Sequence, residues 1–243
     1  MGIIYIGDRA VGKTSLAQEL ANPRNRYVKV TNLSYQGGKP QATDDISSTY
    51  EKPLQIQVEL PTGIKSLMVE WIDTPGEIWR SSWQSNQTHK WESFLEKLAG
   101  SEGILLILPP YREILLPQVP DPDEYITQKQ WVNRFDVWVD FFATRCTKVR
   151  HLLICLNMAD LFISNLKKEA GMLGYVPSGS QMNWQQRDDY LRYKTNYFYP
   201  ITNQINKLTK SIDGSSIRCF VTSIHNRELL ELPWIYLATY LAK

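Results

Sequence analysis

The residues with the clearest chemical potential lie near the amino terminus, in a loop bounded by two glycines. The run from Gly7 to Thr14 fits the pattern GxxxxGK[ST], between a short apolar stretch and a helix-forming stretch. Backbone N–H groups of such a loop can point at phosphate oxygens, and the following helix terminus adds a partial positive charge. Lys13 is then expected to reach the β- and γ-phosphates, and the Thr14 hydroxyl to bind Mg²⁺. The residues predicted to contact a nucleotide here are Gly7, Asp8, Arg9, Ala10, Val11, Gly12, Lys13, Thr14 and Ser15.

A second motif places a carboxylate and a glycine where they could serve the same phosphates. Asp73-Thr74-Pro75-Gly76 follows an apolar stretch at residues 66–72. An aspartate at a strand end can supply a second contact to Mg²⁺, and we expect Asp73 to do so. Gly76 can present its backbone N–H to a γ-phosphate. The two motifs together predict a nucleotide site that holds Mg²⁺.

Strands and helices alternate along the chain, which predicts the framework that brings these motifs together. Apolar runs predict six strands, at residues 2–6, 54–60, 66–72, 103–108, 150–156 and 217–222. Helices are predicted at residues 12–21, 91–99, 124–143, 161–172, 188–208 (kinked or split at Pro200) and 233–242 (with Pro233 in its first turn). This order is typical of an α/β fold whose mostly parallel sheet has helices on both faces, and the hairpin at residues 54–72 adds one antiparallel edge strand. Residues 24–52 are polar and are expected to form a long, mobile loop.

Composition and charge exclude several classes of protein. The chain has 243 residues, of which 43% are hydrophobic and 21% charged, so it can form a sizeable core. A net charge of +2 predicts no broad attraction to nucleic acid or to an anionic membrane. No apolar run reaches the roughly 18 residues of a transmembrane helix, and we expect neither a secretory signal nor a direct membrane anchor. Cys146, Cys155 and Cys219 lack metal-site spacing and are expected to be free thiols, with Cys155 and Cys219 buried, in a reduced, cytoplasmic protein.

These motifs resemble those of the Ras-like small GTPases, within the translation-factor-related class of P-loop GTPases. Two further segments carry the resemblance. Asn157-Met158-Ala159-Asp160 follows a predicted strand as the family's NKxD motif does, and Thr222-Ser223-Ile224 follows the last strand as the family's SA(K) segment does. All four motifs fall in the family's order, each at the carboxyl end of a strand, where ligands bind in open α/β sheets.

The resemblance implies a role for each of these segments. Asp160 would accept hydrogen bonds from the guanine base, and Asn157 would brace its loop against the phosphate loop. Met158 would lie beside the base, and a backbone N–H of the Ser223–Ile224 segment would contact guanine O6. The resemblance also implies a single P-loop GTPase domain over residues 1–243, divergent and with an inserted helical segment near residues 174–210.

Three positions depart from the family's pattern. Met158 stands where Lys is usual; it can pack beside a base but carries no charge, so ATP in place of GTP stays open. Arg9 stands where Ras has Gly, and its side chain could hinder hydrolysis, act as an internal arginine finger or lie in solvent. Glu77 stands where relatives often place a water-positioning Gln, and it could orient or deprotonate water. Lys13, Glu77 and Arg9 are thus the catalytic candidates, and Arg9 and Glu77 together predict slow hydrolysis without a partner.

The segments expected to respond to the γ-phosphate lie near residues 40–50 and 76–89. Thr43 resembles the family's Mg²⁺-sensing threonine in a T-x-x-I pattern, whereas Thr49 lies nearer the expected distance from the next strand; Thr43 is slightly preferred. These switch segments are expected to bind a protein effector or regulator.

The aromatic residues of the inserted segment have two interpretations. Tyr190, Tyr193 and Tyr197 share one helical face. They could belong to an added helix that packs on the domain, or they could anchor a partner protein, since aromatic residues dominate interface anchors.

The sequence as a whole predicts a guanine-nucleotide-binding molecular switch. We expect it to bind Mg²⁺·GTP, to hydrolyse it slowly to GDP and phosphate, and to bind partners through its switch segments. Two alternatives stay open. The first is a nucleotide-binding scaffold without turnover, and the second is a P-loop ATPase or small-molecule kinase.

Overall fold

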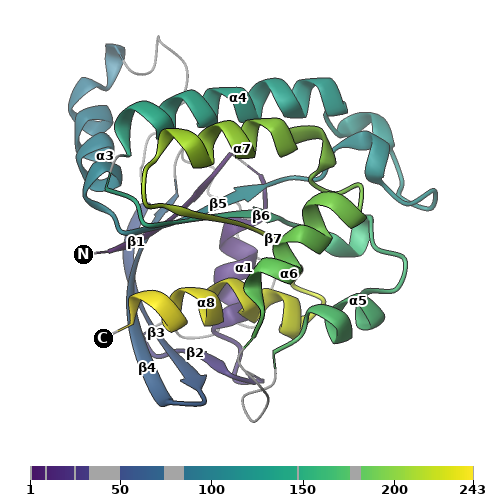
Figure 1. The fold of residues 1–243 in the computed structure, drawn as a ribbon, viewed down its shortest axis with the longest axis horizontal. Coiled ribbons are helices and arrows are strands. Elements are labelled where there is room, and N and C mark those ends of the chain that lie inside the picture. Colours follow the sequence, from purple (N-terminus) through teal and green to yellow (C-terminus); the bar gives the residue numbers. More distant parts are fainter. Residues whose placement is uncertain are drawn as a thin grey trace.

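The apolar runs of the sequence form the strands of one sheet (Figure 1). The computed structural model describes residues 2–8, 10–24, 26–32, 50–73, 85–146, 148–175 and 182–242, and for residues 50–52 and 71–73 it describes the backbone only. The strands are β1 (Ile3–Gly7), β2 (Val28–Val30), β3 (Tyr50–Leu60), β4 (Gly63–Asp73), β5 (Gly103–Leu108), β6 (His151–Leu156) and β7 (Ser216–Val221). The α-helices are α1 (Lys13–Leu20), α3 (Thr88–Gly100), α4 (Gln128–Arg145), α5 (Leu166–Leu173), α6 (Trp184–Asp189), α7 (Thr202–Ser211) and α8 (Arg227–Leu241).

The sheet has the order β2-β3-β4-β1-β5-β6-β7. Strand β3 is antiparallel to both of its neighbours, and the pairs from β4 to β7 are parallel. Every residue of the central strands β1 and β5 is buried, as expected for parallel strands covered on both faces. The predicted α/β fold class, with a mostly parallel sheet between helices, is confirmed.

The sheet has seven strands in the described residues, one more than predicted. Strand β2 lies within the segment that was expected to be a loop, and Val28 pairs with Val58 of β3. Three residues are too short a run for the period of a strand to stand out in the sequence. Because β2 forms the edge, the antiparallel strand β3 lies one position inside the sheet instead of at its edge.

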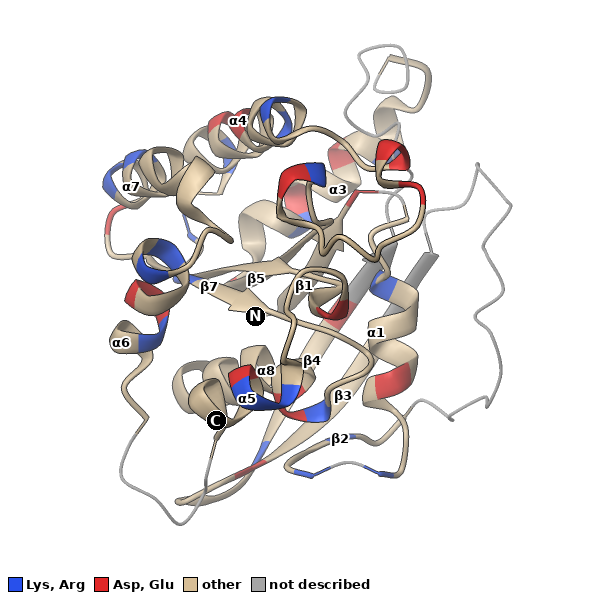
Figure 2. Ribbon diagram, turned by 90° about the vertical axis from the view of Figure 1, so that its right-hand side faces the viewer, with Lys and Arg blue, Asp and Glu red and all other residues tan. Residues whose placement is uncertain are grey.

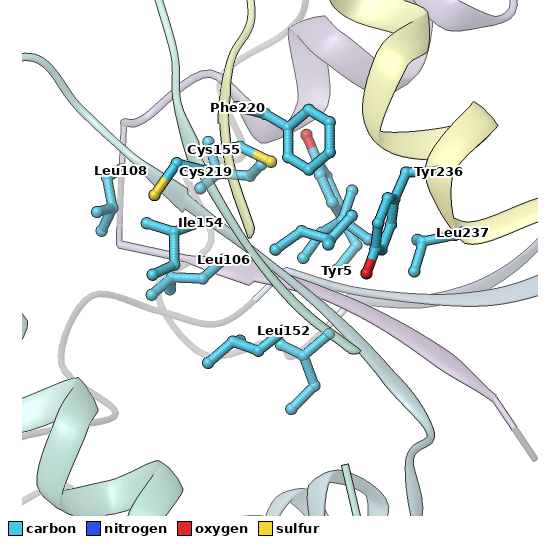
Figure 3. Close-up of a cluster of buried hydrophobic side chains, with 14 of the residues drawn as sticks. Tyr5, Leu106, Leu108, Leu152, Ile154, Cys155, Cys219, Phe220, Tyr236 and Leu237 are labelled. Atoms are coloured by element: carbon cyan, nitrogen blue, oxygen red, sulfur yellow. The ribbon is translucent and has the colours of Figure 1, made fainter. Parts of the chain in front are cut away.

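Helices cover the sheet on two sides. Helices α3, α4 and α7 lie over one face, and α1 and α8 lie against the other (Figure 1). Strands β1 and β5 carry no charged residue, whereas the outer helices carry most of the charge in view (Figure 2). In the core, Tyr236 and Leu237 of α8 lie on one side of the strands, and Leu106 and Leu152 lie on the other (Figure 3). All three cysteines are buried free thiols, as predicted for Cys155 and Cys219.

Two helices differ most from the sequence-based expectation, while α4 and α5 begin four and five residues later than predicted. Helix α8 begins at Arg227, six residues before Pro233, because the side chain of Asn226 accepts the backbone N–H of Leu229 at 3.0 Å and caps the first turn. Pro233 therefore lies inside the helix, and its predicted place in the first turn was wrong. The predicted helix at 188–208 is split, as the proline implied, into α6, a π-helical turn η5 (Tyr190–Lys194), a 3₁₀ turn η6 (Tyr199–Ile201) and α7.

No helix among the described residues is long and apolar enough to cross a membrane.

Candidate nucleotide-binding site

The phosphate loop connects β1 to α1 at the carboxyl edge of the sheet. At Gly7 and Gly12 of this loop, neighbouring atoms leave no room for a Cβ. A Cβ on Gly7 would lie 2.4 Å from the carbonyl oxygen of Ile107, and a Cβ on Gly12 would lie 2.7 Å from the Asn157 amide nitrogen. Gly12 also has a φ of +83°, a left-handed conformation that side chains disfavour. The backbone of this loop therefore lies directly against both β5 and the predicted base loop.

Lys13 places a positive charge at the end of the loop, and only 4% of the residue is exposed. Its ammonium donates hydrogen bonds to the backbone oxygens of Gly7, at 2.9 Å, and Asp8, at 2.8 Å. The hydroxyl of Tyr5 donates to the Lys13 carbonyl at 3.2 Å and ties the first turn of α1 to β1. The positive charge thus lies beside the loop whose N–H groups are expected to meet phosphate.

The other described residues of the loop differ in exposure. Thr14 and Ser15 lie in the first turn of α1 and are partly exposed. Val11 is buried, whereas Ala10 is exposed and has a φ of 60°.

Asp8 adds a carboxylate to the loop. One oxygen lies 3.9 Å from the guanidinium of Arg134, which extends from α4. Burial raises the pKa of Asp8 above its ordinary value, and the nearby charges of Arg134 and Lys13 lower it by less. No local pattern in the sequence indicates this pair, because 126 positions separate the two residues.

The predicted base loop is joined to the phosphate loop by a buried side chain. Asn157 is 3% exposed, and its amide donates to the Val11 carbonyl at 2.8 Å. The hydroxyl of Thr222 donates to the Asn157 side-chain oxygen at 3.0 Å, and the Ala159 N–H donates to the Thr222 carbonyl at 3.0 Å. The contact expected between Asn157 and the phosphate loop is therefore present, and a hydroxyl at the end of β7 orients it.

Residues that follow β7 also contact the side chain of Asp160. The Ser223 hydroxyl donates to one Asp160 carboxylate oxygen, and the His225 N–H donates to the Ser223 hydroxyl at 3.0 Å. The His225 ring lies 3.9 Å from the other Asp160 oxygen. His225 was absent from the predicted site residues, although its position two residues after Ser223 could have indicated it.

Met158 and Ile224 are the two apolar residues among those predicted to lie near the base in these two loops. Met158 has a φ of 58°, and its methyl carbon is 3.6 Å from the point where a Cβ on Gly12 would lie. It therefore lies beside the phosphate loop, as an apolar replacement for a lysine stem would. Ile224 is 39% exposed at the carboxyl end of the last strand.

Several predicted site residues lie outside the described residues. Among these are Arg9, Thr43, Thr49, Gly76 and Glu77, together with most of the two predicted switch segments. Asp73 ends β4, and the structure describes its backbone alone. Their predicted roles stay predictions.

Two of the predicted Mg²⁺ ligands, Thr14 and Asp73, have side chains suited to a magnesium ion and follow or end neighbouring strands. A hydroxyl and a carboxylate are the hard oxygen ligands that Mg²⁺ prefers. Strand β4, which ends at Asp73, is the parallel neighbour of β1, which leads to Thr14, and Tyr5 pairs with Trp71. The carboxyl ends of both strands thus meet at one edge. In the described part of the chain, no group of three or more His, Cys, Asp and Glu side chains forms a separate metal cluster.

The aromatic residues of the segment near residues 174–210 divide between core and surface. Trp184 and Phe198 are buried, and Tyr197 packs edge-on against Phe162 at 5.1 Å between ring centres. Tyr193 and Tyr199 are exposed. The packing of Tyr197 fits an added segment that packs on the domain, and a role of the exposed tyrosines in partner binding stays a prediction.

Comparisons with known proteins found likeness at the level of solved structures. No family model and no curated protein matches the sequence. The signal recognition particle receptor SRb-GTP/SRX complex from Chaetomium thermophilum shares 13% identity at a TM-score of 0.47, over 98% of this chain and 97% of that one. A GTP-binding protein from Sulfolobus solfataricus in complex with GDP shares 14% identity at a TM-score of 0.47, and this chain spans 53% of its length and is itself covered to 99%.

A third structure, the putative nucleolar GTP-binding protein 1 from Plasmodium falciparum, shares 16% identity at a TM-score of 0.44, over 98% of this chain and 84% of that one.

Proposed function

We propose that the chain is a guanine-nucleotide-binding switch that binds Mg²⁺·GTP and hydrolyses it slowly. One observation carries the proposal. The buried amide of Asn157 joins the predicted base loop to the phosphate loop, while Ser223 holds Asp160 at the same edge of the sheet. These hydrogen bonds connect the phosphate loop, the base loop and the segment after β7, whereas a capped turn requires only hydrogen bonds within itself. The arrangement supports a site that reads a phosphate chain and a base together.

In the proposed complex, the phosphate loop binds and the base loop selects. Backbone N–H groups between Asp8 and Thr14 would surround the phosphates, and the Lys13 ammonium would exchange its carbonyl partners for phosphate oxygens. The fixed Asp160 carboxylate accepts hydrogen bonds only, so it suits the N1–H and amino group of guanine. Adenine offers no matching pair of donors at these positions. We therefore propose that Asp160 favours guanine, with Met158 packing beside the base.

Slow turnover is the proposal for the chemical step. Thr14 and Asp73, with Thr43, would hold Mg²⁺, which supplies charge neutralisation on the β- and γ-phosphates when bound. Glu77 would orient the attacking water, and Arg9 is the second catalytic candidate. Protein partners would bind through the segments near residues 40–50 and 76–89.

A single-turnover assay tests the hydrolytic proposal. Protein loaded with GTP labelled at the γ-phosphate should release phosphate at a rate on the order of 10⁻⁴ to 10⁻³ per second, the range of small GTPases without an activating partner. Absence of release, with GTP still bound, would support a scaffold without turnover. Transfer of the label from ATP to a small acceptor would support the kinase alternative.

A further inference from the structure

Helix α4 places an arginine beside the phosphate loop. The Arg134 guanidinium lies 3.9 Å from the Asp8 carboxylate, and Arg134 forms no other ion pair within the described residues. The Asp8 side chain is only 18% exposed, whereas that of Arg134 is 56% exposed. The less solvated partner thus lies on the loop that is expected to meet an anion.

The position of Arg134 is fixed by the start of its helix. Thr127 and Gln130 form a capping box at the first turn of α4. The Gln128 N–H donates to the Glu113 carboxylate at 2.7 Å, and the Trp131 ring N–H donates to the Pro109 carbonyl at 2.9 Å. Trp131 and Arg134 are three residues apart and share a helix face. The loop that follows β5 therefore holds α4 so that Arg134 reaches Asp8.

The charge of Asp8 opposes the task of its loop. A carboxylate in a partly buried loop repels a phosphate chain more strongly than it would in bulk water. Arg134 and Lys13 both interact with this carboxylate, and their charges lower its pKa. Among the described residues, Arg134 and Lys13 are the cations whose charges act on Asp8, so without Arg134 the Lys13 ammonium would interact with both this carboxylate and the phosphates.

We infer that Arg134 is a positioning residue that neutralises Asp8 and leaves the Lys13 ammonium available to the phosphates. The inference rests on the proposed function and extends it. It makes α4 a determinant of affinity for the phosphate chain, with no effect on the choice of base.

A double-mutant cycle tests this role directly. Arg134→Gln should weaken binding of fluorescent GDP by about three- to tenfold, equivalent to about 0.6–1.4 kcal/mol. In an Asp8→Asn background, the same substitution should change affinity by less than about twofold, because no carboxylate is left to neutralise. The loss should shrink between about 0.05 and 0.5 M salt, since Arg134 is half exposed. Arg145→Gln, in the last turn of the same helix, is the control and should leave affinity unchanged.

Three results would overturn the inference. An equal loss in both backgrounds would mean that Arg134 acts on the phosphates or on the helix, independently of Asp8. No loss on Arg134→Gln would mean that the pair has no part in binding. A changed ratio of GDP to ADP affinity in Arg134→Gln would show an effect on the base.

The failure of the proposed function can be told apart from failure of this inference. If the wild-type chain prefers ADP, the guanine proposal fails, and the same cycle with labelled ADP still tests Arg134. If it binds neither nucleotide, inorganic pyrophosphate is titrated by calorimetry, and absence of binding contradicts both proposals. Thermal unfolding of all four variants without nucleotide separates a loss of binding from a loss of folding.

Discussion

Replacing Asn157 with alanine should weaken both the fold and nucleotide binding, because one side chain joins two loops. The substitution removes the hydrogen bond to the Val11 carbonyl and the acceptor of the Thr222 hydroxyl. Each polar group left unpartnered in a buried site costs about 1–3 kcal/mol. Two such groups together would cost about 2–6 kcal/mol, and because the loops can relax we expect a loss near the lower end, about 2–3 kcal/mol in the free energy of unfolding.

The assay is thermal unfolding without nucleotide, together with titration of fluorescent GDP. For a chain of this length, the expected loss lowers the midpoint by about 5–10 °C. Affinity for GDP should fall at least about tenfold, since the phosphate loop is no longer held in its binding conformation. Asn165→Ala is the matched control: Asn165 caps α5 by accepting the Lys168 N–H at 2.9 Å, so its loss should cost about 1 kcal/mol and leave affinity unchanged.

Two outcomes would refute this reasoning. If Asn157→Ala unfolds at the temperature of the wild type, the buried bonds do not contribute as described. If it loses stability but binds GDP as tightly as Asn165→Ala does, then the link between the loops is structural only.

Three further predictions concern Gly12 of the phosphate loop, Asp188 of α6 and His151 at the start of β6. Gly12→Ala should abolish nucleotide binding and lower the unfolding midpoint, because the new Cβ would lie 2.7 Å from the Asn157 amide at a φ of +83°; Gly100→Ala, with nothing within 4 Å, should do neither. Asp188→Asn should lower the free energy of unfolding by about 3 kcal/mol, because the buried Arg192 loses the carboxylate 3.2 Å away. Unfolding by urea measures this loss, and the control Asp189→Asn should lose less than about 0.5 kcal/mol. Burial and the charges of Arg218 and Arg150 lower the pKa of His151, so the folded state disfavours the protonated imidazole. The neutral His151 side chain therefore makes its full contribution to the free energy of unfolding above the unfolded pKa of about 6.5. That contribution is lost as the pH falls from there toward the folded pKa. The unfolding free energy should therefore fall less between about pH 7.5 and pH 5 in His151→Gln than in the wild type, and equal slopes would contradict this assignment.

The sequence identified most of the sheet because its strands are continuous apolar runs. Strands β5 and β6 lie within a residue of their predicted bounds, since each is buried on both faces and flanked by polar or turn-forming residues. Strand β2 was not predicted, because Val28–Val30 forms a strand through its pairing with β3 and carries no local sequence pattern of its own. The start of α8 was displaced because the cap at Asn226 outweighs the preference of Pro233 for a first turn.

The candidate site was predictable where its residues are consecutive. The phosphate loop and the base loop are short motifs, and the Asn157 contact follows from their resemblance to a known pair. Arg134 could not be found in this way, because its relation to Asp8 depends on how α4 is held by Pro109 and Glu113. Contacts between distant segments are set by tertiary packing, which leaves no local signal in one sequence.

A competition titration tests the central claim most directly. Fluorescent GDP bound to the purified protein with Mg²⁺ would be displaced by GDP, GTP, ADP or ATP, for the wild type and for Asp160→Ala. We predict that guanine nucleotides bind the wild type at least about 100-fold more tightly than adenine nucleotides, a difference of about 2.7 kcal/mol, and that Asp160→Ala loses most of this preference. Equal competition by adenine nucleotides in the wild type would contradict the account and would make the Asp160 loop a capped turn without a role in reading the base.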